Sequence, residues 1–250
     1  MTEKDDLPTI AAVAVLAMCL VTTAHEALGH GGACLALGGA IERLTSSLFR
    51  CDLHSRWIDP AGPVMNLVVG TAALVAGRFA AAPAVRLCLL LVTTLSYGWE
   101  GGYAVQAMLT GEGDLYFAGQ AFLGAPDTIW RAGGVAAGIV LYLVNIRLAS
   151  AGLTRLWPNA ARARRAARVA GLATVASAGL AALTYTGRGG HDLHDAVLEI
   201  AAGAVPLLFI PRGSSTDGEG VTLRRNPLLI VSAIVVFAAF TATLGRGIGA

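Results

Sequence analysis

Long apolar stretches joined by short polar connections are the feature that most constrains how this chain can fold. Hydrophobic residues make up 55% of its 250 residues and charged residues only 14%, whereas a soluble domain carries about 25% charged residues. So few charges could not cover the surface of a soluble protein of this length, and we therefore expect lipid to cover it. Because open sheets leave backbone groups unpaired in lipid, the crossing segments should be helices.

These stretches predict an all-α fold, a polytopic helical membrane protein with about six to seven transmembrane helices. A crossing needs about 20 mostly apolar residues, and the acidic start of the chain lacks the basic segment of a signal peptide, so the first stretch is expected to be retained. No linker or internal repeat divides residues 1–250, which are expected to form a single integral membrane domain. The predicted spans are 9–37, 61–83, 86–109, 128–148, 166–186, 193–211 and 227–246.

Clustered arginines predict the orientation of the chain. Cytoplasmic connections of membrane proteins are enriched in Lys and Arg, so we expect the loop 147–168 to be cytoplasmic. Residues 212–225, two crossings later, carry three further arginines, whereas the loop 38–60 should lie outside although it also carries three. A single lysine among many arginines, with abundant Ala and Gly, is compatible with a GC-rich bacterial genome and thus with a bacterial inner membrane. The arginines of the first cluster are Arg147, Arg155, Arg162, Arg164, Arg165 and Arg168.

The four cysteines show no C-x-x-C spacing, which argues against a zinc knuckle or a redox pair. They are Cys19, Cys34, Cys51 and Cys88. We expect most of them to be small apolar residues packed within helices.

Three ionisable residues, His25, Glu26 and His30, lie within the first predicted span. Ionisable groups are costly inside a membrane and are candidates for function by default. In H-E-x-x-H, two histidines at i and i+4 share a helix face and bind zinc, and the glutamate serves as the base. Here the histidines are at i and i+5, which are about 140° apart on an ideal α-helix.

Two arrangements reconcile this spacing with a metal site. A π-bulge can absorb one extra residue, and the glycines at 29, 31 and 32 make such a distortion cheap. Otherwise Glu26 and His30 are the ligands and His25 lies behind them. A purely structural alternative is that the three residues satisfy one another or cap a helix end.

The stretch from His25 to Gly39 resembles the first core helix of the site-2 protease family of intramembrane zinc metalloproteases, whose motif reads H-E-x-x-H. The segment Ala61–Asn66 resembles the G-P-x-x-N element of bacterial members. The third metal ligand of the family is an Asp in an L-D-G motif, and Gly111–Leu115 stands at a comparable distance without that motif. The resemblance covers roughly residues 15–120.

This resemblance implies a hydrolase that cleaves membrane-spanning peptides with a metal-activated water. His25, His30 and Asp114 would bind Zn²⁺, and Glu26 would be the catalytic base. Asn66 would hydrogen-bond the substrate backbone or orient a ligand.

The same resemblance implies a three-helix, protease-like core at about 9–125. Additional helices would then occupy about 126–250.

Other polar residues could contribute to the site. Glu100, between glycines in the third predicted span, could face the metal or pair with a neighbouring helix. A second cluster consists of His191, Asp192, His194, Asp195 and Glu199, and it could hold a metal or help complete the first site. Equally, it could be a solvated helix start, where acidic residues are favoured by the helix dipole.

Two other functions fit the same residues. One is a catalytically inactive, protease-like membrane scaffold that binds a partner protein. The other is a proton or metal transporter lined by the intramembrane ionisable groups. The expected partners are the lipid bilayer and a membrane protein or peptide substrate. Nucleic acid is not expected, because no basic face with interleaved aromatic residues is present.

Overall fold

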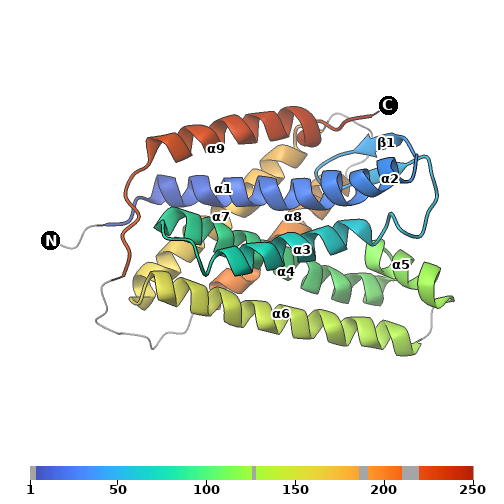
Figure 1. The fold of residues 1–250 in the computed structure, drawn as a ribbon, viewed down its shortest axis with the longest axis horizontal. Coiled ribbons are helices and arrows are strands. Elements are labelled where there is room, and N and C mark those ends of the chain that lie inside the picture. The colour runs from blue at the N-terminus through green and yellow to red at the C-terminus, as the bar shows by residue number, and fades with distance from the viewer. Residues whose placement is uncertain (1–3, 126–127, 186–190, 210–219, 250) are drawn as a thin grey trace.

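The computed structural model describes residues 4–125, 128–185, 191–209 and 220–249, which form a bundle of helices elongated along one direction (Figure 1). Short connections join neighbouring helices, and a two-stranded antiparallel hairpin lies at one end. In chain order the elements are α1 (Leu7–Thr22), the π-helix η1 (Thr23–Gly31), α2 (Gly32–Ala36), β1 (Ile41–Leu44), β2 (Phe49–Cys51), α3 (Ala61–Ala76), α4 (Pro83–Thr110), α5 (Asp114–Leu123), α6 (Thr128–Leu156), α7 (Ala160–Ala182), α8 (His191–Ala204), the 3-10 helix η2 (Val205–Leu208), α9 (Pro227–Phe240) and the π-helix η3 (Thr241–Gly245).

The all-α fold class is confirmed, and a helix lies at each of the seven predicted positions. Within the described residues, three helical segments are long and apolar enough to cross a membrane, namely Leu7–Ala36, Thr128–Leu156 and Pro227–Gly245. The full number of crossings stays a prediction. The end of the sixth predicted span, at 210–211, lies outside the described residues.

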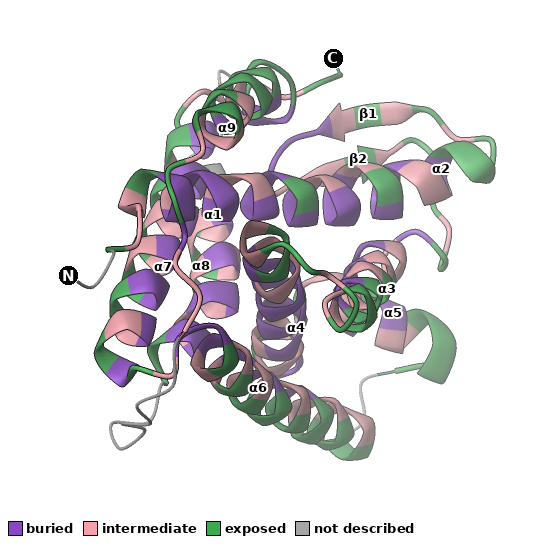
Figure 2. Ribbon diagram, turned by 60° about the vertical axis from the view of Figure 1, so that its left-hand side comes forward, coloured by how far each residue is buried: buried purple, intermediate pink, exposed green. Residues whose placement is uncertain are grey.

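Two of these apolar segments turn most of their surface outward. In the most apolar stretch of α6, only 17% of the residues are buried within the chain, and in the segment formed by α9 and η3 the share is 22%. Figure 2 shows both helices on the outside of the bundle. Apolar surface of this extent marks a contact with a membrane or another protein.

The structure corrects the predicted loop 147–168. Its first part continues α6 to Leu156, and its last part belongs to α7, which begins at Ala160. Asn159 caps α7 by accepting hydrogen bonds from the next turn, at 2.9 Å from Ala161 N and 3.1 Å from Arg162 N. Ala and Arg are strong helix formers, so the arginine cluster extends two helices and leaves only a short turn between them.

The predicted outer loop 38–60 contains structure that we did not predict from the sequence. Strands β1 and β2 pair there, with Leu44 opposite Phe49. A disulfide joins Cys34 to Cys51, so our expectation of apolar packing is wrong for these two cysteines, although Cys19 is buried and free. The pairing depends on β2 folding back onto α2, which no local sequence spacing specifies.

Helix α4 occupies the centre of the bundle and is mostly buried (Figure 2). Its glycines permit close contact with two neighbouring helices. A Cβ atom at Gly98 would lie 2.8 Å from Gly203 Cα in α8, and one at Gly101 would lie 3.0 Å from Tyr142 N in α6. Real Cβ atoms essentially never show the first distance and seldom the second, so these glycines help to set the position of the α4 residues between them.

The two ends of the bundle differ in character. The N-terminus, the α6–α7 turn and residues 220–226 meet at one end, whereas the hairpin and α5 lie at the other (Figure 1). Asp5 ties the first end together and is nearly buried, with 10% of its side chain exposed. It accepts hydrogen bonds of 2.9–3.1 Å from Trp157 Nε1, from Nε and Nη2 of Arg162, and from Leu223 N.

We predict that Asp5→Ala lowers the free energy of unfolding by about 1–2 kcal/mol near neutral pH, because several charge-assisted hydrogen bonds are lost. Burial alone would raise the pKa of Asp5, but the hydrogen bonds from Arg162, Leu223 and Trp157 and the arginine charge outweigh it and lower the pKa. A lowered folded-state pKa stabilises the fold fully above the unfolded pKa of about 3.9 and loses that effect as the pH falls through the folded pKa. The difference between wild type and variant should therefore shrink in acid.

Denaturant unfolding in detergent at neutral and at acidic pH measures this difference. Glu42→Gln, an exposed position on β1, is the matched control and should change little at either pH. An equal loss for Asp5→Ala at both pH values would contradict the prediction.

Candidate metal centre

The histidines of the first long helix lie on a π-helix, η1. A π-helix pairs each backbone N–H with the carbonyl five residues earlier, and Gly32 N–H bonds Ala27 O in this way. Residues at i and i+5 then lie one turn apart on the same face. His25 and His30 are placed in this way, and their Nε2 atoms are 3.2 Å apart. This is the first of the two arrangements considered from the sequence, in which a π-bulge absorbs the extra residue.

Asp114 joins the two histidines from the start of α5. The turn before it requires positive φ angles at Gly111 (+78°) and Gly113 (+98°), which glycine adopts without strain. The Asp114 N–H donates a hydrogen bond to the Tyr103 hydroxyl at 3.1 Å. These features direct the carboxylate toward the histidines, although 84 residues separate it from His30.

Three ligand atoms thus form a nearly equilateral triangle. Asp114 Oδ2 lies 3.2 Å from His30 Nε2 and 3.4 Å from His25 Nε2, and the two Nε2 atoms are 3.2 Å apart. Zinc binds nitrogen and oxygen at about 2.0–2.2 Å with tetrahedral angles, which separates its ligands by about 3.3 Å. The triangle therefore has the dimensions of one face of a zinc tetrahedron.

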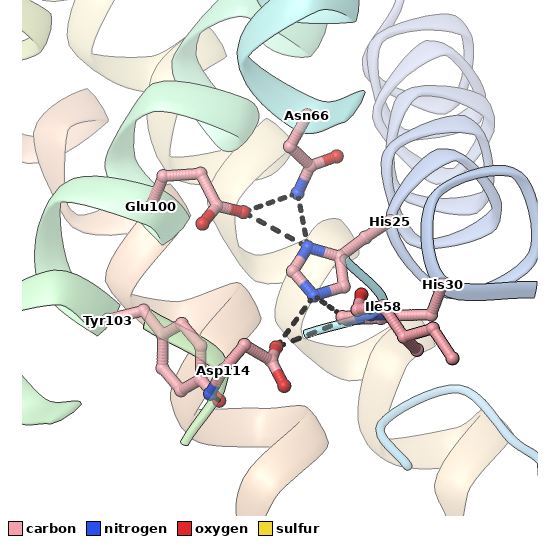
Figure 3. A network of polar contacts seen from close by, with 7 residues as sticks. All are labelled: His25, His30, Ile58, Asn66, Glu100, Tyr103 and Asp114. Atoms are coloured by element: carbon pink, nitrogen blue, oxygen red, sulfur yellow. Dashed lines mark hydrogen bonds and ion pairs between the residues drawn. The ribbon is translucent and has the colours of Figure 1, made fainter. Parts of the chain in front are cut away.

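Hydrogen bonding on the far side of each ring shows which atoms carry lone pairs. His30 Nδ1 lies 2.8 Å from the Ile58 carbonyl oxygen, which only accepts, so Nδ1 carries the hydrogen and Nε2 of the neutral ring has a lone pair. His25 Nδ1 lies 3.1 Å from both the Glu100 carboxylate oxygen and the Asn66 amide nitrogen (Figure 3), and pairing with the carboxylate places the hydrogen on Nδ1. Two lone pairs and a carboxylate that point together repel one another unless a proton or a metal ion lies between them, and this donor set fits a metal ion.

Aromatic rings hold both imidazoles in place. The His25 ring stacks on Trp99 with centroids 4.5 Å apart, and the His30 ring stacks on Phe49 of β2 at 5.6 Å. Both histidines are about 97–98% buried. Little freedom remains for either ring to turn away.

Close backbone contact brings α3 against η1. A Cβ atom at Gly29 would lie 2.6 Å from Gly62 Cα, and one at Gly62 would lie 2.7 Å from His25 Nε2 and closer still to His30 Nε2. The Gly-Pro start of α3, singled out in the sequence, thus leaves the space that the imidazoles occupy. Asn66, one turn further along α3, is completely buried.

Glu100 and Asn66 meet His25 on the side away from Asp114 (Figure 3). Glu100 Oε1 and Asn66 Nδ2 each lie 3.1 Å from His25 Nδ1, and Asn66 Nδ2 donates to Glu100 Oε1 at 2.8 Å. Neither residue lies near the open side of the triangle. The geometry therefore places Asn66 behind a histidine and not on the open, cleft side of the triangle.

A cleft of about 540 Å³ leads to the cluster. Glu26 lines it and is 97% buried, and its Oε2 has no hydrogen-bond partner among the described residues. Asp59 also lines it, and burial together with the Asp114 carboxylate raises the pKa of Asp59. The cleft is thus a polar passage that ends at the ligand triangle.

The second cluster of the sequence divides in the structure. Asp195 and Glu199 line the cleft, and Oε2 of Glu199 is buried with no hydrogen-bond partner among the described residues. His194 is exposed and pairs with Asp195 at 3.1 Å. The side chain of His191 lies outside the described part of the structure.

Several residues of the site escaped sequence reasoning. The Ile58 carbonyl, Trp99 and Phe49 are brought to the histidines by tertiary packing, and no motif marks them. The positive-φ pair Gly111 and Gly113 was a usable signal, because G-x-G before an acidic residue is typical of a sharp turn into a helix.

We predict that Gly62→Ala weakens zinc binding by about tenfold or more, because the added methyl group would displace both imidazoles. Gly32→Ala is the matched control, since a Cβ atom there meets nothing within 4 Å. Competition with a chromophoric chelator measures both affinities, and circular dichroism checks that each variant stays helical. Equal affinities in the two variants would refute this account of Gly62.

Comparisons with known proteins give no match to this chain: no family model, no curated protein and no solved structure is significantly similar. The resemblance to the site-2 protease family, drawn from the motifs at 25–39 and 61–66, stays a prediction. The function of the site is therefore inferred from its geometry.

Proposed function

We propose that this chain is an intramembrane zinc metalloprotease of the site-2 protease type, which hydrolyses membrane-spanning peptides. The observation that carries the proposal is the triangle of His25 Nε2, His30 Nε2 and Asp114 Oδ2, with edges of 3.2–3.4 Å. Beside it lies Glu26, whose Oε2 has no hydrogen-bond partner in the described part of the chain. Three protein ligands of these types leave a fourth tetrahedral position open, as catalysis by zinc requires.

The chemistry follows from the positions of the chain's own groups. A zinc ion held by the three ligands would supply a Lewis acid that makes water acidic and polarises a carbonyl. Glu26 would accept a proton from a water molecule in the cleft. The remaining hydroxyl adds to the scissile carbonyl carbon, the C–N bond breaks, and Glu26 gives the proton to the amine nitrogen.

The depth of the site supports a substrate cut near a membrane surface. His25 lies 18 residues after Leu7, the start of α1, which corresponds to about 27 Å along a helix. The apolar core of a bilayer is about 30 Å thick. If α1 begins at one surface, the site lies close to the other.

The two ends of the bundle support the predicted orientation. The arginine-rich end of α6 and start of α7 lie with the beginning of α1, at the end of the bundle that we assign to the cytoplasm of a bacterial inner membrane by the positive-inside rule. The Cys34–Cys51 disulfide lies at the opposite end with the candidate site. Disulfides persist in oxidising compartments, so the cleft is proposed to open on the outer side. Arg212 lies outside the described residues.

We predict that the purified protein binds about one zinc per chain and that His30→Ala loses it, because one of three ligands is removed. Glu26→Gln should keep the metal and lower the rate of peptide cleavage by about 10²–10⁴-fold, the usual contribution of a positioned base. Elemental analysis gives the metal content, and a panel of model transmembrane peptides in liposomes gives the rate.

Glu42→Gln, an exposed position on β1 that does not line the cleft, is the control and should match wild type in both measurements. A wild-type protein without bound transition metal would overturn the proposal. Bound zinc with no cleavage that depends on Glu26 would instead favour the inactive, partner-binding scaffold.

We also predict that Cys34 and Cys51 react with a membrane-impermeant maleimide from outside intact bacteria, and only after reduction, because they are disulfide-bonded on the outer side. The Cys19→Ala, Cys88→Ala double variant removes the other thiols. Labelling is measured by the mass shift of the protein. Reaction only after the cytoplasmic face is exposed would contradict the orientation.

A further inference from the structure

Glu100 is the most deeply buried carboxylate that the proposed reaction does not use. It lies on α4 with 2% of its surface exposed, and Oε1 contacts only His25 and Asn66 among the described residues. A buried carboxylate is costly unless a positive charge or several donors compensate it. The two contacts on Oε1 therefore call for an explanation beyond packing.

We propose that Glu100 and Asn66 form a positioning pair that selects the tautomer of His25 and balances the charge of the bound metal, an inference that rests on the proposed function. The Nδ1–H of His25 donates to Glu100 Oε1 at 3.1 Å, which leaves the lone pair on Nε2, the atom that faces Asp114 and His30. The opposite tautomer would place a hydrogen between the ligands and exclude a metal.

Asn66 completes this arrangement by fixing the carboxylate. Its Nδ2 donates to the same Oε1 atom at 2.8 Å, so the oxygen is held by two donors from different elements. The amide also lies 3.1 Å from His25 Nδ1. Oxygen, amide nitrogen and ring nitrogen thus form a second triangle behind the ring, opposite the ligand triangle (Figure 3).

Charge accounting supports the same role. A divalent ion with two neutral imidazoles and the Asp114 carboxylate has a net charge of +1. The Glu100 carboxyl group, 3.1 Å from His25 on the far side of the ring, is placed to offset this charge in a buried, low-dielectric setting.

Packing of α4 explains how the carboxylate is held at this depth. Trp99, the preceding residue, stacks on the His25 ring at 4.5 Å. On the other side Gly101 contacts the backbone of α6 so closely that a Cβ atom would lie 3.0 Å from Tyr142 N. Glu100 stands between these two contacts, and partners of this kind behind a ligating histidine commonly strengthen metal binding by about 10–100-fold.

The test is zinc affinity, measured by competition with a chromophoric chelator, with the Co²⁺ absorption spectrum as a second readout. Glu100→Gln keeps the shape but removes the charge, and it should weaken zinc binding by about tenfold or more. Combining it with Asn66→Asp moves the carboxylate to the neighbouring corner of the same triangle, 3.1 Å from His25 Nδ1 in the native structure. This double variant should recover most of the lost affinity, which a purely structural role would not produce.

Thr94→Val is the matched control on α4. Thr94 is fully buried, and its hydroxyl donates only to Leu90 O of its own helix, at 2.8 Å, so this variant should keep wild-type affinity and spectrum. Wild-type affinity in Glu100→Gln, or no recovery in the double variant, would overturn the positioning role and leave the proposed function standing. Absence of metal from the wild type would overturn both.

Discussion

The π-helical turn at Thr23–Gly31 is the constraint on which the candidate site depends. An α-helix would direct His25 and His30 about 140° apart, and no single ion could bind both. The extra residue in the turn brings their Nε2 atoms to 3.2 Å. The turn packs closely against α3 through the contact between Gly29 and Gly62. The same turn therefore provides the face that carries both histidines and the surface that packs closely against α3.

The central helix α4 organises what lies behind this turn. It contributes Trp99 and Glu100 to the far side of His25, and its end leads through two glycines with positive φ to Asp114. The ligand triangle is thus assembled from η1 and α5, but both sides of it are positioned by α4. Because α6 and α8 pack against the glycines of α4, two helices that supply no proposed ligand still help to determine where Glu100 lies.

The hairpin and its disulfide close the site from the end of the bundle. Phe49 of β2 stacks on His30, and Cys51 at the end of the same strand is bonded to Cys34 of α2. The covalent link therefore holds one of the ring contacts of the site. The acidic cleft passes beside this hairpin and reaches Glu26 and Asp114. The end of the bundle that restrains the His30 ring therefore also contains the entrance to the site.

Local sequence features predicted the helices and the first ligand candidates. The length of an apolar run is a local property, so each predicted span has a helical counterpart. His25, Glu26 and His30 were identified from their residue types and their position in a span, and Asp114 from the family resemblance. Three features follow from the packing of the whole chain: the i, i+5 spacing forms a π turn, Glu100 lies behind His25, and Cys34 pairs with Cys51. Packing of α8 also determines that Asp195 and Glu199 line the cleft, whereas His194 is exposed. These outcomes depend on contacts between residues up to 84 positions apart, whose energies come from packing and not from local preference.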